Sequence, residues 1–117
     1  MLKSIPALVQ EIRANLRCID ASTAMEEIKK CNGVLIDVRE PAEFAEKPAP
    51  LSTNIPRGLI EMKVATMFPK EDTPIYLHCA TGARATFAGE QLQRMGYNTV
   101  SVITCSLDEV CSQQERR

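Results

Sequence analysis

Residues 74–96 read PIYLHCATGARATFAGEQLQRMG and hold a strand, a loop and a helix in direct succession. The short apolar run before Cys79 predicts a strand that is buried on both faces. Small residues follow Cys79, and an amphipathic pattern from residue 83 predicts a helix that stops at Gly96. The inward face of that helix is expected to hold Ala85, Ala88, Leu92 and Met95. A strand that leads through a tight loop into a helix is the repeating unit of α/β folds.

The same alternation extends from this stretch towards both ends of the chain. Strands are expected at residues 17–20, 33–38, 73–79 and 98–103, with a short one near residues 54–55. Helices are expected at residues 4–16, 22–30, 41–46, 58–68, 83–96 and 106–117. Ser4 is the expected cap of the first helix, and Thr23 with Glu26 forms an expected capping box in the second. The pattern predicts an α/β fold whose parallel sheet is covered on both faces.

Composition narrows the classes of function. The chain has 117 residues and a net charge of −1, which favours one domain and gives no basic patch for nucleic acid. No signal peptide and no membrane-spanning segment are expected, because charged and polar residues interrupt the apolar N-terminal run. The five cysteines are an odd number and widely spaced, which favours reduced thiols in the cytoplasm. With one histidine and no C-x-x-C pair, no structural metal site is expected.

Cys79 is the candidate nucleophile. It lies at the carboxyl end of a predicted parallel strand, where α/β folds form their binding sites. The backbone N–H groups of the small residues after it can turn towards one point and bind an anion, and the following helix directs its positive end there. Arg84 adds a full positive charge, and surroundings of this kind favour the thiolate. The expected anion-binding set is Ala80, Thr81, Gly82, Ala83 and Arg84.

The other candidate side chains have simpler interpretations. Cys18 and Cys31 are expected to be buried and inert, as most cysteines outside active sites are. His78 precedes Cys79 directly, but neighbours on a strand point to opposite faces. We therefore expect His78 to bond within its own backbone neighbourhood and not to act as the base for Cys79.

Four motifs together resemble the rhodanese-like domain family, in its single-domain thiosulfate sulfurtransferase form. CATGARA resembles the C-x-x-G-x-R-[SA] active-site loop, and LIDVREPAEF resembles the D-V-R-E-x-x-E-F stretch. NIP and MGYNTVSVI match two further motifs in the same order. The resemblance extends from about residue 17 to residue 110. It implies a domain over residues 17–117, with an N-terminal helix at residues 1–16 outside its core.

The resemblance also implies a fold and a chemistry. The fold is a three-layer α/β/α sandwich with a five-stranded parallel sheet in the order 3-2-4-5-1. The chemistry is sulfur transfer without a cofactor, in which Cys79 takes a sulfane sulfur from a small anion such as thiosulfate. The resulting persulfide passes this sulfur to cyanide, to a low-molecular-weight thiol or to a protein.

Two other functions stay open at this point. Related phosphatases and arsenate reductases have five residues between the loop cysteine and arginine, whereas four separate Cys79 from Arg84. The shorter loop favours sulfur chemistry and makes the phosphatase the weaker alternative. Some rhodanese-like domains are binding or regulatory modules without activity. These usually lack the loop cysteine, which is present here.

Two stretches outside the loop depart from the family pattern, and two residues outside it are expected to support the loop. The family often has G-H-I-x-G-A before N-I-P and a G-G pair after the last strand. Here the first stretch reads KPAPLST, and Cys105 occupies the first glycine position. Cys105 is therefore a candidate second thiol that could form a disulfide with Cys79. Asp37 and Arg39 are expected to support the loop, with Arg39 pairing with Glu43 across a turn.

Overall fold

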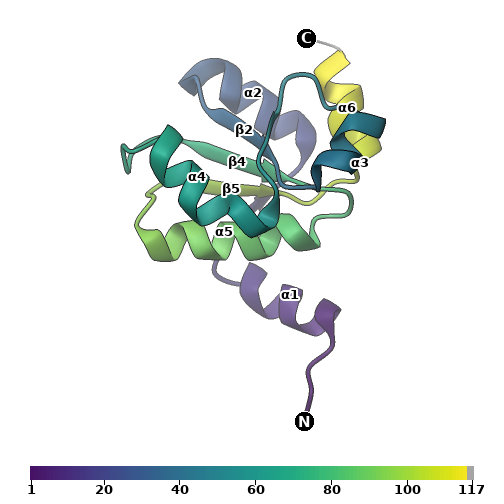
Figure 1. Ribbon diagram of the computed structural model, residues 1–117, viewed down its shortest axis with the longest axis vertical. Helices are drawn as coiled ribbons and strands as arrows, with labels where there is room; N and C mark the ends of the chain where they lie inside the picture. Colours follow the sequence, from purple (N-terminus) through teal and green to yellow (C-terminus); the bar gives the residue numbers. More distant parts are fainter. Residues whose placement is uncertain (116–117) are drawn as a thin grey trace.

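The computed structural model describes residues 1–115, and its centre is one five-stranded parallel sheet (Figure 1). The strand order is β1-β5-β4-β2-β3, so the order expected from the family is confirmed. Hydrogen-bonded register pairs Asp37 with His78 across β2 and β4, and Leu77 with Val102 across β4 and β5. The strands are β1 (Arg17–Ile19), β2 (Val34–Asp37), β3 (Thr53–Asn54), β4 (Ile75–His78) and β5 (Val100–Ile103).

Helices cover both faces of the sheet. The helical elements are α1 (Ile5–Arg13), α2 (Ala21–Cys31), α3 (Pro41–Glu46), the 3-10 turn η1 (Arg57–Leu59), α4 (Ile60–Met67), α5 (Ala83–Met95) and α6 (Leu107–Glu115). One core cluster joins α4 and α5 to one face of the sheet, and a second joins α2 and α6 to the other. The expected three-layer sandwich is therefore confirmed. The expected terminal helix reached residue 117, and residues 116–117 lie outside the described part of the chain.

Local sequence signals explain where most helices begin and end. Ser4 caps α1 as expected, accepting a bond from the Ala7 N–H at 3.3 Å. The capping box expected at Thr23 is wrong, because the Asp20 carboxylate accepts from the Thr23 N–H at 2.7 Å. Helix α2 therefore begins at Ala21, one residue after its cap. Gly96 ends α5 with a φ of 113°, a left-handed conformation that glycine adopts without strain.

Three burial expectations are wrong. Cys18 and Cys31 are exposed, because Cys18 lies on an edge strand and Cys31 in the last turn of α2. Met95 is 44% exposed, and it is the last residue of α5. Strand β4 is buried along its whole length, as its apolar run predicted, and β5 is buried along its whole length as well.

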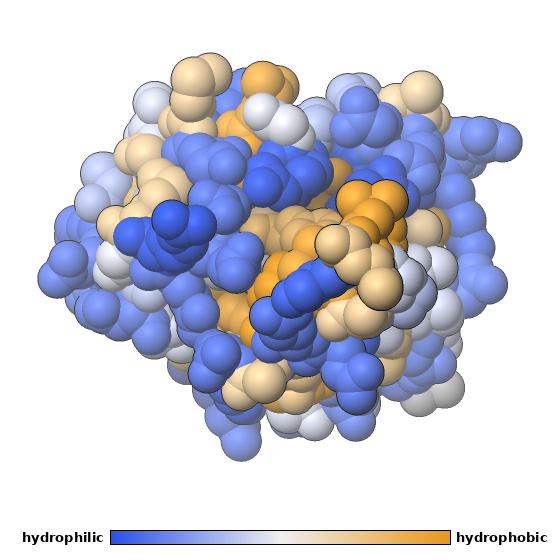
Figure 2. Space-filling view, turned by 90° about the horizontal axis from the view of Figure 1, so that it is seen from below, coloured by the Kyte–Doolittle hydropathy of each residue, from blue (hydrophilic) through white to orange (hydrophobic). Residues whose placement is uncertain are grey.

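Helix α1 packs on the outer surface of α5, on the side away from the sheet (Figure 1). It ends at Arg13, earlier than expected, and Leu16 packs against the core as part of the following turn. Val9 is buried, whereas Ile5 is 58% exposed. Figure 2, seen from the α1 end of the molecule, shows hydrophobic side chains within a largely hydrophilic surface. A surface cavity of about 320 Å³ is lined by residues of α1, of the turn after it and of α5.

Candidate active site

Cys79 lies directly after β4 and is almost completely buried, with 1% of its surface exposed. Its Sγ atom faces two backbone N–H groups, that of Gly82 at 3.1 Å and that of Ala85 at 3.4 Å. The first turn of α5 has no intrahelical partners for its amides, so these N–H groups are available to an anion. The sulfur therefore lies where a negative charge is stabilised by the start of α5.

The small-residue loop takes this shape around Gly82. Gly82 has a φ of 100° and precedes the first residue of α5, and its carbonyl accepts from both the N–H and the hydroxyl of Thr86. The Ala80 carbonyl accepts from the Leu107 N–H at 3.0 Å, which attaches the loop to the start of α6. Thr81 is exposed. Gly82 was expected from the sequence, whereas Ala85 was not, although the free amides of a helical first turn indicate such a position.

Arg84 lies in the first turn of α5 and forms a two-pronged ion pair with Glu43 of α3. Its Nη1 and Nη2 atoms donate to the two carboxylate oxygens at 2.6 Å and 3.1 Å. These bonds lower the pKa of Glu43 to about 2, and the bond from the Glu40 N–H makes the next largest contribution. Glu43 is therefore ionised at neutral pH, and it is a site residue for which the sequence predicted a different partner.

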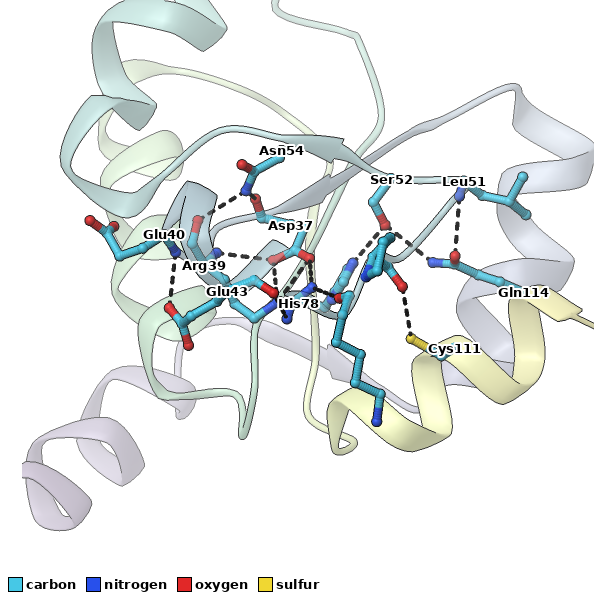
Figure 3. Close-up of polar contacts among 12 residues, drawn as sticks. Asp37, Arg39, Glu40, Glu43, Leu51, Ser52, Asn54, His78, Cys111 and Gln114 are labelled. Carbon is cyan, nitrogen blue, oxygen red and sulfur yellow. Dashed lines mark hydrogen bonds and ion pairs between the residues drawn. The ribbon is translucent and has the colours of Figure 1, made fainter. Parts of the chain in front are cut away.

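The expected pairing of Arg39 with Glu43 is only partly right. The Arg39 guanidinium binds the Asp37 carboxylate, with Nη2 to Oδ2 at 2.7 Å and Nε to both oxygens at 3.0–3.1 Å. With Glu43 it forms a bond only to the backbone carbonyl, at 3.2 Å. The pair is buried. Figure 3 shows the contact between the two side chains. The pair holds the segment that leads into α3, and so it positions Glu43.

His78 points away from Cys79 but does not bond as expected. Its Nε2 atom lies 2.7 Å from the hydroxyl of Ser52, which also accepts from the Gln114 amide (Figure 3). Burial lowers the pKa of His78 to about 4, and the nearby Asp37 carboxylate opposes this only in part. Among the described residues, no hydrogen-bond partner faces Nδ1. The neutral imidazole links β4 to the loop before β3 and to α6.

Cys105 is placed with the opposite face of the sheet from Cys79. Its Sγ atom accepts from the Ala21 N–H at 3.3 Å, and its side chain packs with the α2–α6 core cluster. Cys79 belongs to the α4–α5 cluster. The structure therefore does not bring these two thiols together, and a Cys79–Cys105 disulfide gains no support from it.

A surface cavity of about 470 Å³ lies beside the loop. Its lining is formed by Arg39, Glu43, Glu46, Lys47, Ala80 and Leu107. The cavity therefore joins α3, the start of α6 and the residue after Cys79. Within residues 1–115, no cluster of three His, Cys, Asp or Glu side chains is arranged to hold a metal ion. Nor does any helix in this range have the length and apolarity needed to cross a membrane.

Comparison with known families agrees with this geometry. The sequence model of the rhodanese-like domain matches residues 20–113. The chain belongs to the rhodanese-like family. The matched part includes every strand except β1, together with Cys79, Arg84 and Glu43, whereas β1 and α1 lie outside it.

Several relatives of this rhodanese-like domain are named sulfurtransferases. A sulfurtransferase of Allochromatium vinosum is 31% identical over 83 residues, covering 70% of this chain and 76% of the relative. The mitochondrial thiosulfate sulfurtransferase RDL2 of Saccharomyces cerevisiae is 32% identical over 87 residues, covering 65% of this chain and 58% of RDL2. This chain also spans 59% of the length of a mitochondrial relative from Schizosaccharomyces pombe.

Solved structures show the same fold. The crystal structure of RDL2 superposes with a TM-score of 0.63 at 26% identity, covering 84% of this chain and 90% of that chain. A protein of unknown function from Rhodopseudomonas palustris superposes with a TM-score of 0.81 at 21% identity, covering 96% and 92% of the two chains. This second likeness includes more of the chain and concerns the fold alone.

Proposed function

We propose that this rhodanese-like domain is a sulfurtransferase in which Cys79 carries the transferred sulfur as a persulfide. The observation that supports this most directly is the position of the Cys79 Sγ atom, which faces the N–H groups of Gly82 and Ala85. Two such donors stabilise a thiolate before the reaction, and they also stabilise the charge of a persulfide after it. The names of the relatives support the same class of reaction.

The proposed reaction has two balanced halves. The Cys79 thiolate attacks the outer sulfur of thiosulfate, so that a new S–S bond forms, the sulfur–sulfur bond of thiosulfate breaks and sulfite leaves. A thiophilic acceptor such as cyanide or a thiol then attacks the outer sulfur of the persulfide and regenerates the Cys79 thiolate. No oxidant, metal or cofactor enters this sequence, and each leaving group takes away the electron pair of the bond that breaks.

The remaining proposed site residues assist these steps. Gly82 supplies an N–H to the sulfur, and Ala80, Thr81 and Ala83 keep the approach to it free of large side chains. Arg84 contributes the charge that attracts an anionic donor, while Asp37 and Arg39 act as structural supports of α3. The acceptor is a small thiol or a protein, and a cytoplasmic location remains part of the proposal.

The decisive experiment is mass spectrometry after incubation with thiosulfate. We expect the mass of one additional sulfur atom on the peptide that contains Cys79. Cys79→Ser should lose both this adduct and the formation of thiocyanate from thiosulfate and cyanide. Cys18→Ser removes an exposed thiol remote from the loop and is the matched control.

Two outcomes would favour the other functions. A wild-type protein that forms no adduct with thiosulfate or with an organic persulfide would favour a binding module. Hydrolysis of an aryl phosphate that depends on Cys79 would favour a phosphatase, although the four-residue loop argues against it.

A further inference from the structure

The charges around the cavity beside Cys79 are largely neutralised by one another. Arg39 and Lys47 line the cavity, Arg84 pairs with Glu43 of its lining, and each of these three cations faces a carboxylate. The pairs are Arg39 with Asp37, Lys47 with Asp108, and Arg84 with Glu43. Glu46 adds another carboxylate to the lining. A donor with two negative charges therefore enters a site without the surplus of positive charge that the loop motif predicts.

Glu43 is held firmly in the position that neutralises Arg84. Its Oε1 atom accepts from the Glu40 N–H at 3.0 Å, as part of the capping box at the start of α3. The same atom accepts from Nη1 of Arg84, and Oε2 accepts from Nη2. Both terminal amino groups of the guanidinium thus face a carboxylate. An anionic donor therefore meets a guanidinium whose charge is already paired and which has only its remaining N–H groups to offer.

We infer that Glu43 is a specificity-determining residue that selects against dianionic sulfur donors in favour of donors with at most one negative charge at the reacting group. This inference rests on the proposed sulfurtransferase function and narrows its substrate class. The favoured class comprises thiosulfonates and organic persulfides, which need less of the Arg84 charge. The N–H groups of Gly82 and Ala85 serve every donor equally, because they face the Cys79 sulfur itself.

The step with such donors is the same substitution at sulfur. The Cys79 thiolate attacks the terminal sulfur of R–SO₂–S⁻, an S–S bond forms, and the sulfinate R–SO₂⁻ leaves with the electrons of the broken bond. With an organic persulfide R–S–SH, the thiolate R–S⁻ leaves and takes up a proton from water. Neither reaction requires an additional oxidant or reductant.

Thiosulfate and methanethiosulfonate are matched probes, because a methyl group in the second replaces one anionic oxygen in the first. We would measure kcat and KM for thiocyanate formation with each donor in the wild type and in Glu43→Gln. Glutamine also fits the capping box, so α3 should keep its start. The KM for thiosulfate should fall about tenfold in this variant, since a nearby charge–charge repulsion is removed. The KM for methanethiosulfonate should change by less than about threefold.

Glu61→Gln is the control, because it also removes a carboxylate paired with an arginine, Arg57 of η1, away from the cavity lining. The ratio of the KM for thiosulfate to the KM for methanethiosulfonate should stay unchanged in Glu61→Gln. An unchanged ratio in Glu43→Gln, or an equal shift in Glu61→Gln, would overturn the inference.

Alkylation of Cys79 separates failure of this inference from failure of the proposed function. If the wild type transfers sulfur from neither donor, the proposed function fails. Sulfate and methanesulfonate can then be compared as protectants of Cys79 against iodoacetamide. Glu43→Gln should make sulfate about tenfold more protective relative to methanesulfonate. Equal protection ratios in the wild type and the variant would again reject the role of Glu43.

Discussion

Arg13, in the last turn of α1, donates its Nε–H to the hydroxyl oxygen of Thr86 over 3.0 Å. The Thr86 hydroxyl donates in turn to the carbonyl of Gly82 over 2.8 Å. The N–H of Gly82 faces the Cys79 sulfur on the other side of the same residue. A side chain outside the matched family region at residues 20–113 is therefore connected, through two hydrogen bonds, to the loop that holds the candidate nucleophile.

Arg13→Ala should weaken both the fold and the loop. Loss of a charge-assisted hydrogen bond between the half-buried Arg13 and the buried Thr86 is expected to cost ~1.5–3 kcal/mol of the free energy of unfolding, as measured by urea denaturation. Sulfur transfer should also slow, because Gly82 loses a support. Lys3→Ala, just before α1, breaks an exposed ion pair with Glu11 of α1 and should cost ~0–1 kcal/mol. Equal losses in the two variants would show that Arg13 acts only as part of α1.

Arg84→Ala should raise the KM for thiosulfate. The substitution removes the cation and leaves the Glu43 carboxylate at the cavity without its partner, so repulsion of an anionic donor increases. We expect a KM increase of about tenfold or more, with a smaller effect for methanethiosulfonate. Arg84→Lys should restore only part of the affinity, because an ammonium group cannot form the two-pronged contact. Steady-state kinetics with both donors test this, and an unchanged KM for thiosulfate would show that the backbone N–H groups suffice.

Three glycine-to-alanine substitutions distinguish the cost of backbone strain from the cost of a steric contact at the added Cβ atom. Gly82 and Gly96 both have positive φ angles, but only at Gly82 would a Cβ atom meet a neighbour, the Arg13 Nη2 atom at 2.6 Å. Gly96→Ala should therefore cost the strain alone, ~1–2 kcal/mol. Gly82→Ala should cost at least as much and also reduce sulfur transfer. Gly58→Ala meets nothing within 4 Å and is the control. Full activity in Gly82→Ala would argue against the proposed loop geometry.

Asp37→Asn should be among the most destabilising single substitutions. Asp37 and Arg39 are fully or almost fully buried, so the variant leaves a buried guanidinium without its counter-charge. Breaking such a pair typically costs ~3–5 kcal/mol, which chemical denaturation would detect directly. Glu27→Gln breaks a partly exposed pair with Arg17 and should cost at most ~1 kcal/mol. A loss at Asp37 no larger than at Glu27 would contradict the supporting role given to the buried pair.

His78 should titrate at a pH well below that of an ordinary histidine. Because the chain has one histidine, the ring protons can be followed by NMR without ambiguity. The midpoint should lie near 4 in the folded protein, since burial lowers the pKa of His78 from 6.5. The unfolded chain binds this proton first, so the contribution of His78 to stability is complete above about pH 6.5 and is lost as the pH falls towards 4. A midpoint near 6.5 would show that water reaches the ring.

The sequence by itself determined the order of strands and helices, the parallel sheet and the position of Cys79. These features depend on local information: continuous apolar runs mark buried strands, glycine marks the end of α5, and an α/β alternation restricts the sheet to few topologies. The sequence indicates Thr23 as the cap of α2, whereas the structure shows Asp20 in that role. Both residue types favour the cap position, and only the backbone geometry distinguishes them.

Only the tertiary structure decided which charged groups meet. Arg84 and Glu43 are 41 residues apart in sequence, and folding brings α3 and α5 together at the carboxyl edge of the sheet. The sequence favoured Arg39 as the partner of Glu43, since they are four residues apart, but Arg39 is buried against Asp37 instead. Cys105 and Cys79 follow neighbouring strands, yet they pack in core clusters on opposite faces of the sheet. The physical reason is that strand and helix patterns depend on neighbours along the chain, whereas ion pairs and thiol positions depend on which faces meet in space.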